Sequence, residues 1–211
     1  MSSLQNFHPR AFEIAGNDTD LAYYTAHPHL SLMDVGGYKA VETLYHTFLQ
    51  EGDTILDLMC GRNSHLPNDI PFQEVIGLDI SKEALQENPI LTKQIVEDIN
   101  QSPQIPLPDE SINAVCLCCT FEYLRKPQAI FKESFRILKP GGCILITFTD
   151  RFLPIRATAL WQALNTEDRQ RLIYLLLEEA GFVERDKGEV HPPTDHKIWK
   201  DTVYSVIGRK S

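Results

Sequence analysis

Short apolar runs alternate with longer amphipathic segments along most of this chain. Five such runs predict buried strands, at residues 55–59, 74–79, 93–96, 114–119 and 143–149. Two more, at 182–186 and 202–209, predict closing strands on either side of a loop that contains Pro192 and Pro193. Strands that alternate with helices favour an α/β fold with a doubly wound sheet.

The segments between most of these strands show apolar residues at helical spacing. Helices are predicted at residues 38–49, 81–88, 127–138, a segment that ends near 164, and 165–180. Pro67 and Pro71 leave little room for a full crossover helix after the first strand. A shorter helix is predicted before the breaking pair His27-Pro28. We expect residues 1–50 to form a helical leading segment that covers the binding crevice.

The composition is that of an ordinary globular protein. The 211 residues predict one domain over 1–211, with 43% hydrophobic and 23% charged residues. No apolar run approaches the ~20 residues that a membrane span requires, and the first ten residues lack a secretory signal pattern. A net charge of −9 argues against binding to nucleic acid. We therefore expect a cytoplasmic protein, a monomer or homodimer, with neither nucleic acid nor membrane as partner.

The five cysteines are expected to be reduced and mostly buried. Cys116 and Cys119 have a C-x-x-C spacing, but on a strand their side chains point to opposite faces. His27 and His29 resemble a metal-binding pair but have no matched carboxylate or cysteine partner. We predict no metal site.

Three acidic residues follow the pattern of a nucleoside site. Asp57 lies in the first strand, Asp79 ends the second and Asp98 follows the third. The carboxyl ends of parallel strands meet at one edge of a sheet, and a ribose-binding acid is expected about 20 residues after the first loop glycine. A lone acid after a strand could equally cap a helix. Three at successive strands favour a nucleoside site.

A dinucleotide is a weaker prediction. The three positions that would be glycine in G-x-G-x-x-G are Met59, Gly61 and Ser64. A pyrophosphate also needs the helix N-terminus that Pro67 and Pro71 disfavour.

The motifs, taken in order, resemble the class I S-adenosylmethionine-dependent methyltransferases that act on small molecules. The fragments are ILDLMCG, VIGLDIS, EDIN, LPDESINAV, YL and RILKPGG, followed later by EAGF. The resemblance covers residues 53–150 and implies a seven-stranded, mostly parallel sheet that ends in an antiparallel hairpin. The chain departs from the family in its glycine loop, LDLMCGRNSHLP, and has Asn113 and Tyr123 where many relatives have Asp and His.

The resemblance implies S-adenosylmethionine as cofactor and assigns its contacts by position. The methionine part would lie by Asp57 and the backbone of Met59, Cys60 and Gly61. The nucleoside would be held by Asp79 at the ribose, Ile80 at the adenine ring, and Asp98 and Ile99 at its amino edge. The sulfonium and the methyl acceptor would lie near Cys119 and Thr120.

Methyl transfer is an in-line displacement that needs positioning, with a base where the acceptor must lose a proton. His65 is the first candidate for that base, although it could instead be a structural loop histidine. His29 is the second candidate, and it could instead be a surface residue. Tyr123 could orient the acceptor or simply pack.

The segment after the fifth strand contains Arg151 and Arg156. A guanidinium there could bind a carboxylate, which predicts a small anionic or zwitterionic acceptor. A solvated surface arginine is the alternative.

Two other functions fit parts of the pattern. The irregular glycine loop suits a non-catalytic cofactor-binding or interaction protein that kept the fold. A nicotinamide-dependent oxidoreductase is disfavoured by Met59 and the prolines after the first strand.

Overall fold

The computed structural model describes residues 7–8, 10–27 and 31–211. Its centre is a seven-stranded sheet with the strand order β3-β2-β1-β4-β5-β7-β6. The strands are β1 (Thr54–Leu58), β2 (Glu74–Asp79), β3 (Lys93–Val96), β4 (Ile112–Cys118), β5 (Leu138–Phe148), β6 (Glu184–Val190) and β7 (Val203–Arg209). β1 to β5 pair in parallel, and β7 runs antiparallel to both β5 and β6. The predicted fold class is confirmed.

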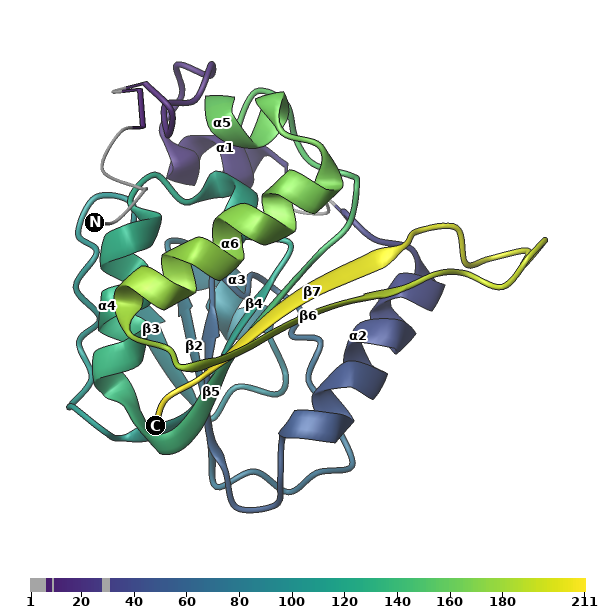
Figure 1. Cartoon of the computed structure of the whole chain (residues 1–211). Coiled ribbons are helices and arrows are strands. Elements are labelled where there is room, and N and C mark those ends of the chain that lie inside the picture. Colours follow the sequence, from purple (N-terminus) through teal and green to yellow (C-terminus); the bar gives the residue numbers. More distant parts are fainter. Residues whose placement is uncertain (1–6, 9, 28–30) are drawn as a thin grey trace.

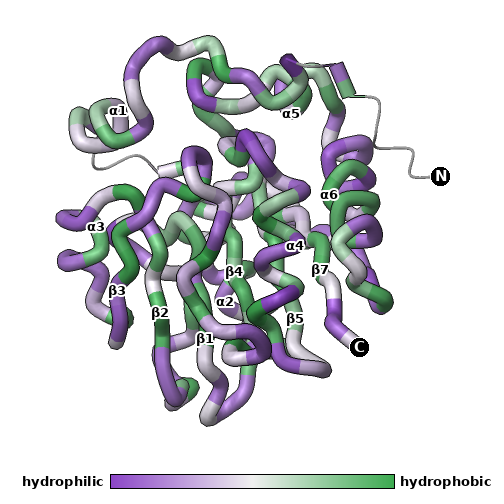
Figure 2. The backbone as a smooth tube through the Cα atoms, turned by 90° about the vertical axis from the view of Figure 1, so that its left-hand side faces the viewer, coloured by the Kyte–Doolittle hydropathy of each residue, from purple (hydrophilic) through white to green (hydrophobic). Residues whose placement is uncertain are grey.

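Helices cover both faces of the sheet (Figure 1). They are α1 (Asp20–Ala26), α2 (Val35–Phe48), α3 (Lys82–Glu87), the 3-10 turn η1 (Phe121–Tyr123), α4 (Pro127–Ile137), α5 (Ala159–Ala163) and α6 (Thr166–Ala180). Side chains that alternate along β1 separate two apolar cores, because Leu56 and Leu58 pack towards α4 and α6 whereas Ile55 packs towards α2. Apolar stretches lie in the central strands, and α1 and α5 lie beyond one end of the sheet (Figure 2).

α2 begins three residues earlier than the sequence pattern predicts. The Asp34 carboxylate accepts a hydrogen bond from the Gly37 N–H and also from the N–H groups of Lys200 and Asp201 in the β6–β7 loop. At Gly36 an added Cβ would lie 2.1 Å from Trp199, so only glycine fits there. The helix start thus depends on contacts with residues about 165 positions away, which local periodicity does not contain.

Two strand boundaries also differ from the predictions. β5 begins at Leu138 rather than at residue 143, because Leu138 pairs with Ile112 before a register shift lets the chain bend through Gly141 (φ +79°). β6 covers Glu184–Val190 rather than 182–186, since it pairs with β7 along its whole length. β6 is the edge strand and therefore tolerates charged residues. These residues interrupt the apolar pattern, so the sequence pattern does not predict its full length.

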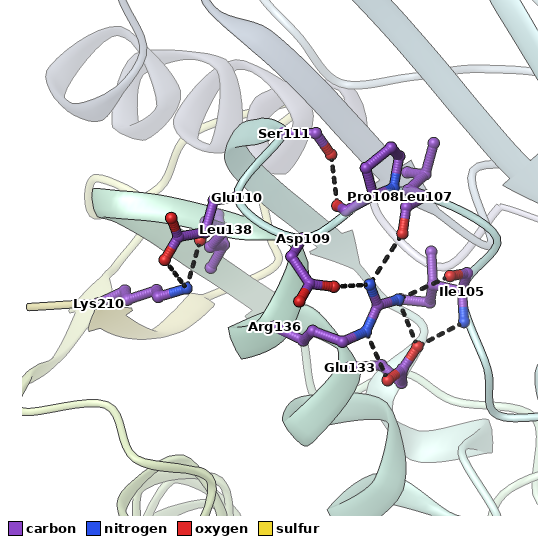
Figure 3. Close-up of polar contacts among 10 residues, drawn as sticks. All are labelled: Ile105, Leu107, Pro108, Asp109, Glu110, Ser111, Glu133, Arg136, Leu138 and Lys210. Carbon is purple, nitrogen blue, oxygen red and sulfur yellow. Dashed lines mark hydrogen bonds and ion pairs between the residues drawn. The ribbon is translucent and has the colours of Figure 1, made fainter.

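The β3–β4 connection is fastened to α4 by the Arg136 guanidinium (Figure 3). This group donates to both carboxylate oxygens of Glu133 and to Asp109. It also donates to the carbonyl oxygens of Ile105 and Leu107, at 2.9 Å each. Glu133 completes the cluster by accepting from the Ile105 N–H. The loop that follows Asp98 and Ile99 is therefore held at its far end by one arginine.

Arg136→Ala should lower the free energy of unfolding by about 1.5–3 kcal/mol, because it leaves partly buried carbonyls and Glu133 without their charged donor. Urea unfolding followed by circular dichroism measures this change. The matched control is Arg171→Ala, at an exposed arginine on α6, which should change the unfolding free energy by under about 0.5 kcal/mol. Equal effects of the two substitutions would contradict the role of Arg136 as a clamp.

Candidate functional site

A cavity of about 230 Å³ opens at the carboxyl ends of β1, β2, β3 and β4. Its floor comes from the residues that follow these strands, and its roof includes Asp20, Tyr24 and His27 of the leading segment. Tyr38 of α2 adds a side wall. In the described part of the chain, the predicted leading segment therefore lies over the crevice at the sheet edge.

Two strand exits have unusual backbone geometry. Met59 and Cys119, the first residues after β1 and β4, have φ values of +55° and +52°. Both are non-glycine residues in the left-handed region, and both line the cavity. The Met59 N–H donates to the Leu78 carbonyl at 2.7 Å, and the Cys119 N–H donates to the Thr147 carbonyl at 2.8 Å. The neighbouring strands thus enforce a strained turn at both exits, as is common at binding sites.

Asp79 joins the first strand's loop to the end of the second strand. One carboxylate oxygen accepts from the Gly61 N–H at 3.0 Å and the other from the Ser81 N–H at 2.9 Å. Burial raises the pKa of Asp79, although these two N–H groups act in the opposite direction. Each oxygen keeps a second lone pair for a ligand hydroxyl. A Cβ added at Gly61 would meet no atom within 4 Å, so the loop backbone itself is open to a ligand.

The other predicted nucleoside contacts line the same cavity. Ile80, Asp98 and Ile99 lie along it, as does Cys60. One oxygen of Asp98 accepts from the N–H groups of Asn100 and Gln101, at 3.0 and 3.3 Å. These bonds fix the carboxylate in a turn at the end of β3.

Thr120 lines the cavity with a hydroxyl that has no hydrogen-bond partner among the residues that the structure describes. The residue is only 7% exposed. A buried, unpaired hydroxyl of this kind is suited to bind a polar ligand atom.

Asp57 does not line the cavity. It is 4% exposed and lies behind the loop, where burial raises its pKa to about 7 while the Ser64 hydroxyl and His65 lower it. A contact between Asp57 and a ligand remains a prediction.

His65 lines the cavity and stacks on Tyr38, with ring centroids 4.6 Å apart. Burial lowers its pKa, but Cys118 and Asp57 raise it further, and the net shift is upward. A histidine with a raised pKa holds its proton more tightly. The sequence analysis could not foresee this shift because Cys118 is 53 positions away, and the role of His65 as a base stays a prediction.

The other two catalytic candidates are His29 and Tyr123. His29 lies outside the described residues. Tyr123 lines the cavity but is 6% exposed, and its hydroxyl accepts a hydrogen bond from the Leu153 N–H at 3.0 Å. This contact gives Tyr123 a structural partner, which favours the packing alternative.

The two arginines that suggested an anionic acceptor have other partners. Arg156 is 2% exposed and forms an ion pair with Asp20, and its guanidinium also donates to the Asp18 carbonyl. Arg151 pairs with Asp201 at 2.9 Å. Neither is among the residues that line the cavity. That these arginines bind an acceptor carboxylate stays a prediction, because Arg156 is buried in its ion pair with Asp20 whereas Arg151 is exposed and pairs with Asp201.

Comparison with known proteins gives this arrangement a family. Residues 56–146 match the family described as "Methyltransferase domain". A relative named a probable S-adenosylmethionine-dependent methyltransferase, from Mycolicibacterium smegmatis, is 30% identical over 145 residues, which is 66% of this chain and 56% of the relative. These matches support a class I S-adenosylmethionine-dependent methyltransferase and its cofactor, as the sequence motifs predicted.

Solved structures share the fold of this chain. A SAM-dependent methyltransferase from Aquifex aeolicus is 19% identical, with a TM-score of 0.61 over 92% of this chain and 100% of that one. The cyclase SpnF is 16% identical, with a TM-score of 0.59 over 90% of this chain and 91% of its own. At these identities the likeness concerns the fold alone. The chain spans about half the length of the first curated relatives it matches, with 56%, 51% and 37% of each covered.

The attachment of this roof is the part that sequence reasoning missed. Asp20 forms ion pairs with both Arg125 and Arg156, and Asn100 donates to Asp20 and to the Tyr123 carbonyl. These contacts attach α1 to the carboxyl edge of the sheet. The sequence shows an acid in a weak helix and two distant arginines, and no local pattern links them.

Glu122 was also missed, because a glutamate in a short turn reads as a surface residue. It is 1% exposed, and neither carboxylate oxygen has a hydrogen-bond partner in any other described residue. Burial raises its pKa from 4.5 to about 8. The folded protein therefore retains a proton here that the unfolded chain releases. Its contribution to stability is fully present below about pH 4.5 and is lost as the pH rises towards 8.

Glu122→Gln should remove this pH-dependent loss of stability, because glutamine has no charge to bury. The difference in unfolding free energy between the variant and the parent protein should therefore increase by about 1–3 kcal/mol from about pH 5 to about pH 8, in favour of the variant. Urea unfolding of both proteins at the two pH values measures this difference. The other titrating groups are the same in both proteins, so their contributions cancel. Glu51→Gln, at an exposed turn, serves as the control. Parallel pH profiles for the parent and the Glu122 variant would show that this carboxyl titrates normally.

Proposed function

We propose that this chain transfers a methyl group from S-adenosylmethionine to a small-molecule acceptor by in-line displacement. The observation that carries the proposal is the Asp79 carboxylate, fixed by the Gly61 and Ser81 N–H groups beside an open loop backbone. The bound cofactor supplies a methyl group on a sulfonium centre. The chain's own residues have only to bind, orient and exclude water.

The residues along the cavity fit the parts of this cofactor. Asp79 would accept hydrogen bonds from the ribose hydroxyls, since both its oxygens retain a lone pair. Ile80 and Ile99 would pack against adenine, and Asp98 would accept from its amino group. The open backbone at Gly61 would lie along the methionine part. The carboxylates on the wall also favour a cation over an anion at this site.

The acceptor side of the cavity is formed by Thr120, Tyr38 and the roof residues Tyr24 and His27. The unpaired Thr120 hydroxyl would bind a polar atom of the acceptor. The roof restricts the space to a small molecule and excludes water from the reacting centre. A small anionic or zwitterionic acceptor stays a prediction, and neither Arg151 nor Arg156 lines the cavity.

His65 remains the first candidate for a base where the acceptor must lose a proton, and Cys118 and Asp57 raise its pKa. The Tyr123 hydroxyl accepts a hydrogen bond from the Leu153 N–H, which favours packing as its role. The five cysteines are free thiols, which supports a reducing, cytoplasmic setting. No described helix is long and apolar enough to cross a membrane.

A non-catalytic cofactor-binding protein is the second candidate. The fold is shared with a cyclase, so the fold alone does not dictate methyl transfer. Binding of cofactor without methylation of any acceptor in a broad panel would support this alternative.

Calorimetric titration with S-adenosylhomocysteine, with NAD as control, is the direct test. We expect binding of S-adenosylhomocysteine alone, because the loop between β1 and β2 contains no helix to hold a pyrophosphate. Methylation of an acceptor panel with labelled cofactor then separates an enzyme from a binding protein. Preference for NAD would overturn the proposal.

Asp79→Ala should weaken S-adenosylhomocysteine binding about tenfold to a hundredfold, because it removes charged acceptors worth ~1–3 kcal/mol. Titration calorimetry on the folded variant measures the loss. Asp186→Ala, on the distant edge strand β6, is the matched control and should leave affinity unchanged. An unaltered affinity in a folded Asp79 variant would refute the ribose assignment.

A further inference from the structure

The loop that leaves β1 has no regular structure of its own to hold it in place. Residues 59–73 form neither a helix nor a strand. In doubly wound folds a helix after the first strand usually packs against this loop. In this chain, residues 59–63 nevertheless line the cavity. Another element must therefore fix the exit loop, which we define as residues 59–65.

The C-terminal end of α3 contacts the exit loop directly. Nδ2 of Asn88, the residue after α3, donates to the Gly61 carbonyl at 3.2 Å and to the Ser64 hydroxyl at 3.1 Å. Both hydrogens of its amide group are thereby used. Asn88 is 4% exposed, and its own N–H donates to the Leu85 carbonyl of the helix. A buried side chain that is fixed to α3 thus bridges two points of the loop.

A second contact between the same two elements is exposed. Arg62 Nη1 lies 2.5 Å from the Glu87 carboxylate, but the Glu87 side chain is 61% exposed. An ion pair at this exposure contributes little, because water screens it. The buried amide of Asn88 is therefore the main attachment of the exit loop to α3.

The hydrogen bonds of Gly61 determine where the next N–H group points. The Gly61 N–H donates to the Asp79 carboxylate at 3.0 Å, and its carbonyl accepts from Asn88. The Gly61 carbonyl and the Arg62 N–H belong to one planar peptide, in which they point in opposite directions. Asn88 therefore turns the Arg62 N–H away from α3. This N–H has no hydrogen-bond partner among the described residues, so it is an available donor for a ligand.

The charges along the cavity favour this position for a ligand carboxylate. Among the described residues that line the cavity, carboxylates are carried by Asp20, Asp79, Glu97 and Asp98. Arg62 is the one lysine or arginine in this set. A ligand carboxylate would be repelled along the wall that holds these acids and attracted beside Arg62.

We propose that Asn88 is a positioning residue for the cofactor, because its hold on the Gly61 carbonyl presents the Arg62 N–H to the carboxylate of the cofactor's amino-acid end. This inference rests on the proposed function, since it concerns the same ligand. Asn88 is not among the residues that line the cavity, so it acts through the exit loop. It supplies the support that a helix after β1 would otherwise give.

Titration calorimetry with two ligands tests this role. S-adenosylhomocysteine carries the amino-acid end, whereas 5′-methylthioadenosine has the same nucleoside without it. Asn88→Ala should weaken S-adenosylhomocysteine binding about tenfold more than 5′-methylthioadenosine binding, because the loss of two hydrogen bonds frees the peptide that meets the carboxylate. A general loosening of the fold would weaken both ligands alike. Equal losses for the two ligands, or no loss, in the folded variant would overturn the proposal.

Gln94→Ala is the matched control. Gln94 Nε2 donates to the Leu85 carbonyl at 2.9 Å, so it too attaches a side-chain amide to α3, but its hydrogen bond lies outside the exit loop. This variant should keep the parent's ratio of the two affinities. A shift of the ratio as large as that of Asn88→Ala would show that any disturbance of α3 has this effect, and it would overturn the specific role of Asn88.

The parent protein allows a second test that requires no variant. In nitrogen–proton correlation spectra, the amide proton of Arg62 should move downfield when S-adenosylhomocysteine binds, because its N–H gains a charged acceptor. It should change little when 5′-methylthioadenosine binds. An Arg62 resonance at the same position with both ligands would refute the contact with the carboxylate.

These measurements separate the inference from the proposed function. Binding of both ligands with no dependence on Asn88 would refute the positioning role and leave the cofactor assignment intact. Binding of neither ligand to the parent protein would refute the proposed function, and this inference with it.

Discussion

The site depends on the parallel pairing of β1 between β2 and β4. The register sets Leu58 opposite Leu78 and Asp57 opposite Cys116. The next residues along each strand therefore emerge at one edge. Because hydrogen bonds from the neighbouring strands fix Met59 and Cys119 in left-handed geometry, the chain turns at that edge instead of continuing the sheet. A one-residue slip would exchange the faces of every side chain and dismantle the cavity.

Features that depend on local chemistry could be predicted from the sequence. Apolar runs indicated the strands, and the acids at strand ends indicated where Asp79 and Asp98 would meet. The rest depends on long-range partners. The start of α2 requires Lys200 and Asp201, and the engagement of Arg156 requires Asp20. Periodicity and spacing contain no information about such pairs, so the sequence could not show that Arg151 and Arg156 have carboxylate partners or how the roof is attached.

The same limit applies to the chemistry of the cavity. His65 in isolation is a plausible base, and Cys118 in isolation is a buried strand residue. In the folded protein, Cys118 raises the pKa of His65, and His65 lowers the pKa of Cys118. Cys60, in the same wall but beside two carboxylates, shows the opposite shift. Reactivity here is a property of neighbours and not of residue type.

The roof helix α1 has a thermodynamic character unlike that of the core. It contains no fully buried residue, and it is attached through Asp20 to Arg125 and Arg156. Lifting it would break these ion pairs while both apolar cores stay packed, so this motion would carry a smaller change in heat capacity than global unfolding. Global unfolding, which exposes two apolar cores, has a strongly curved temperature dependence. Opening of the cavity should therefore have the flatter temperature dependence of the two.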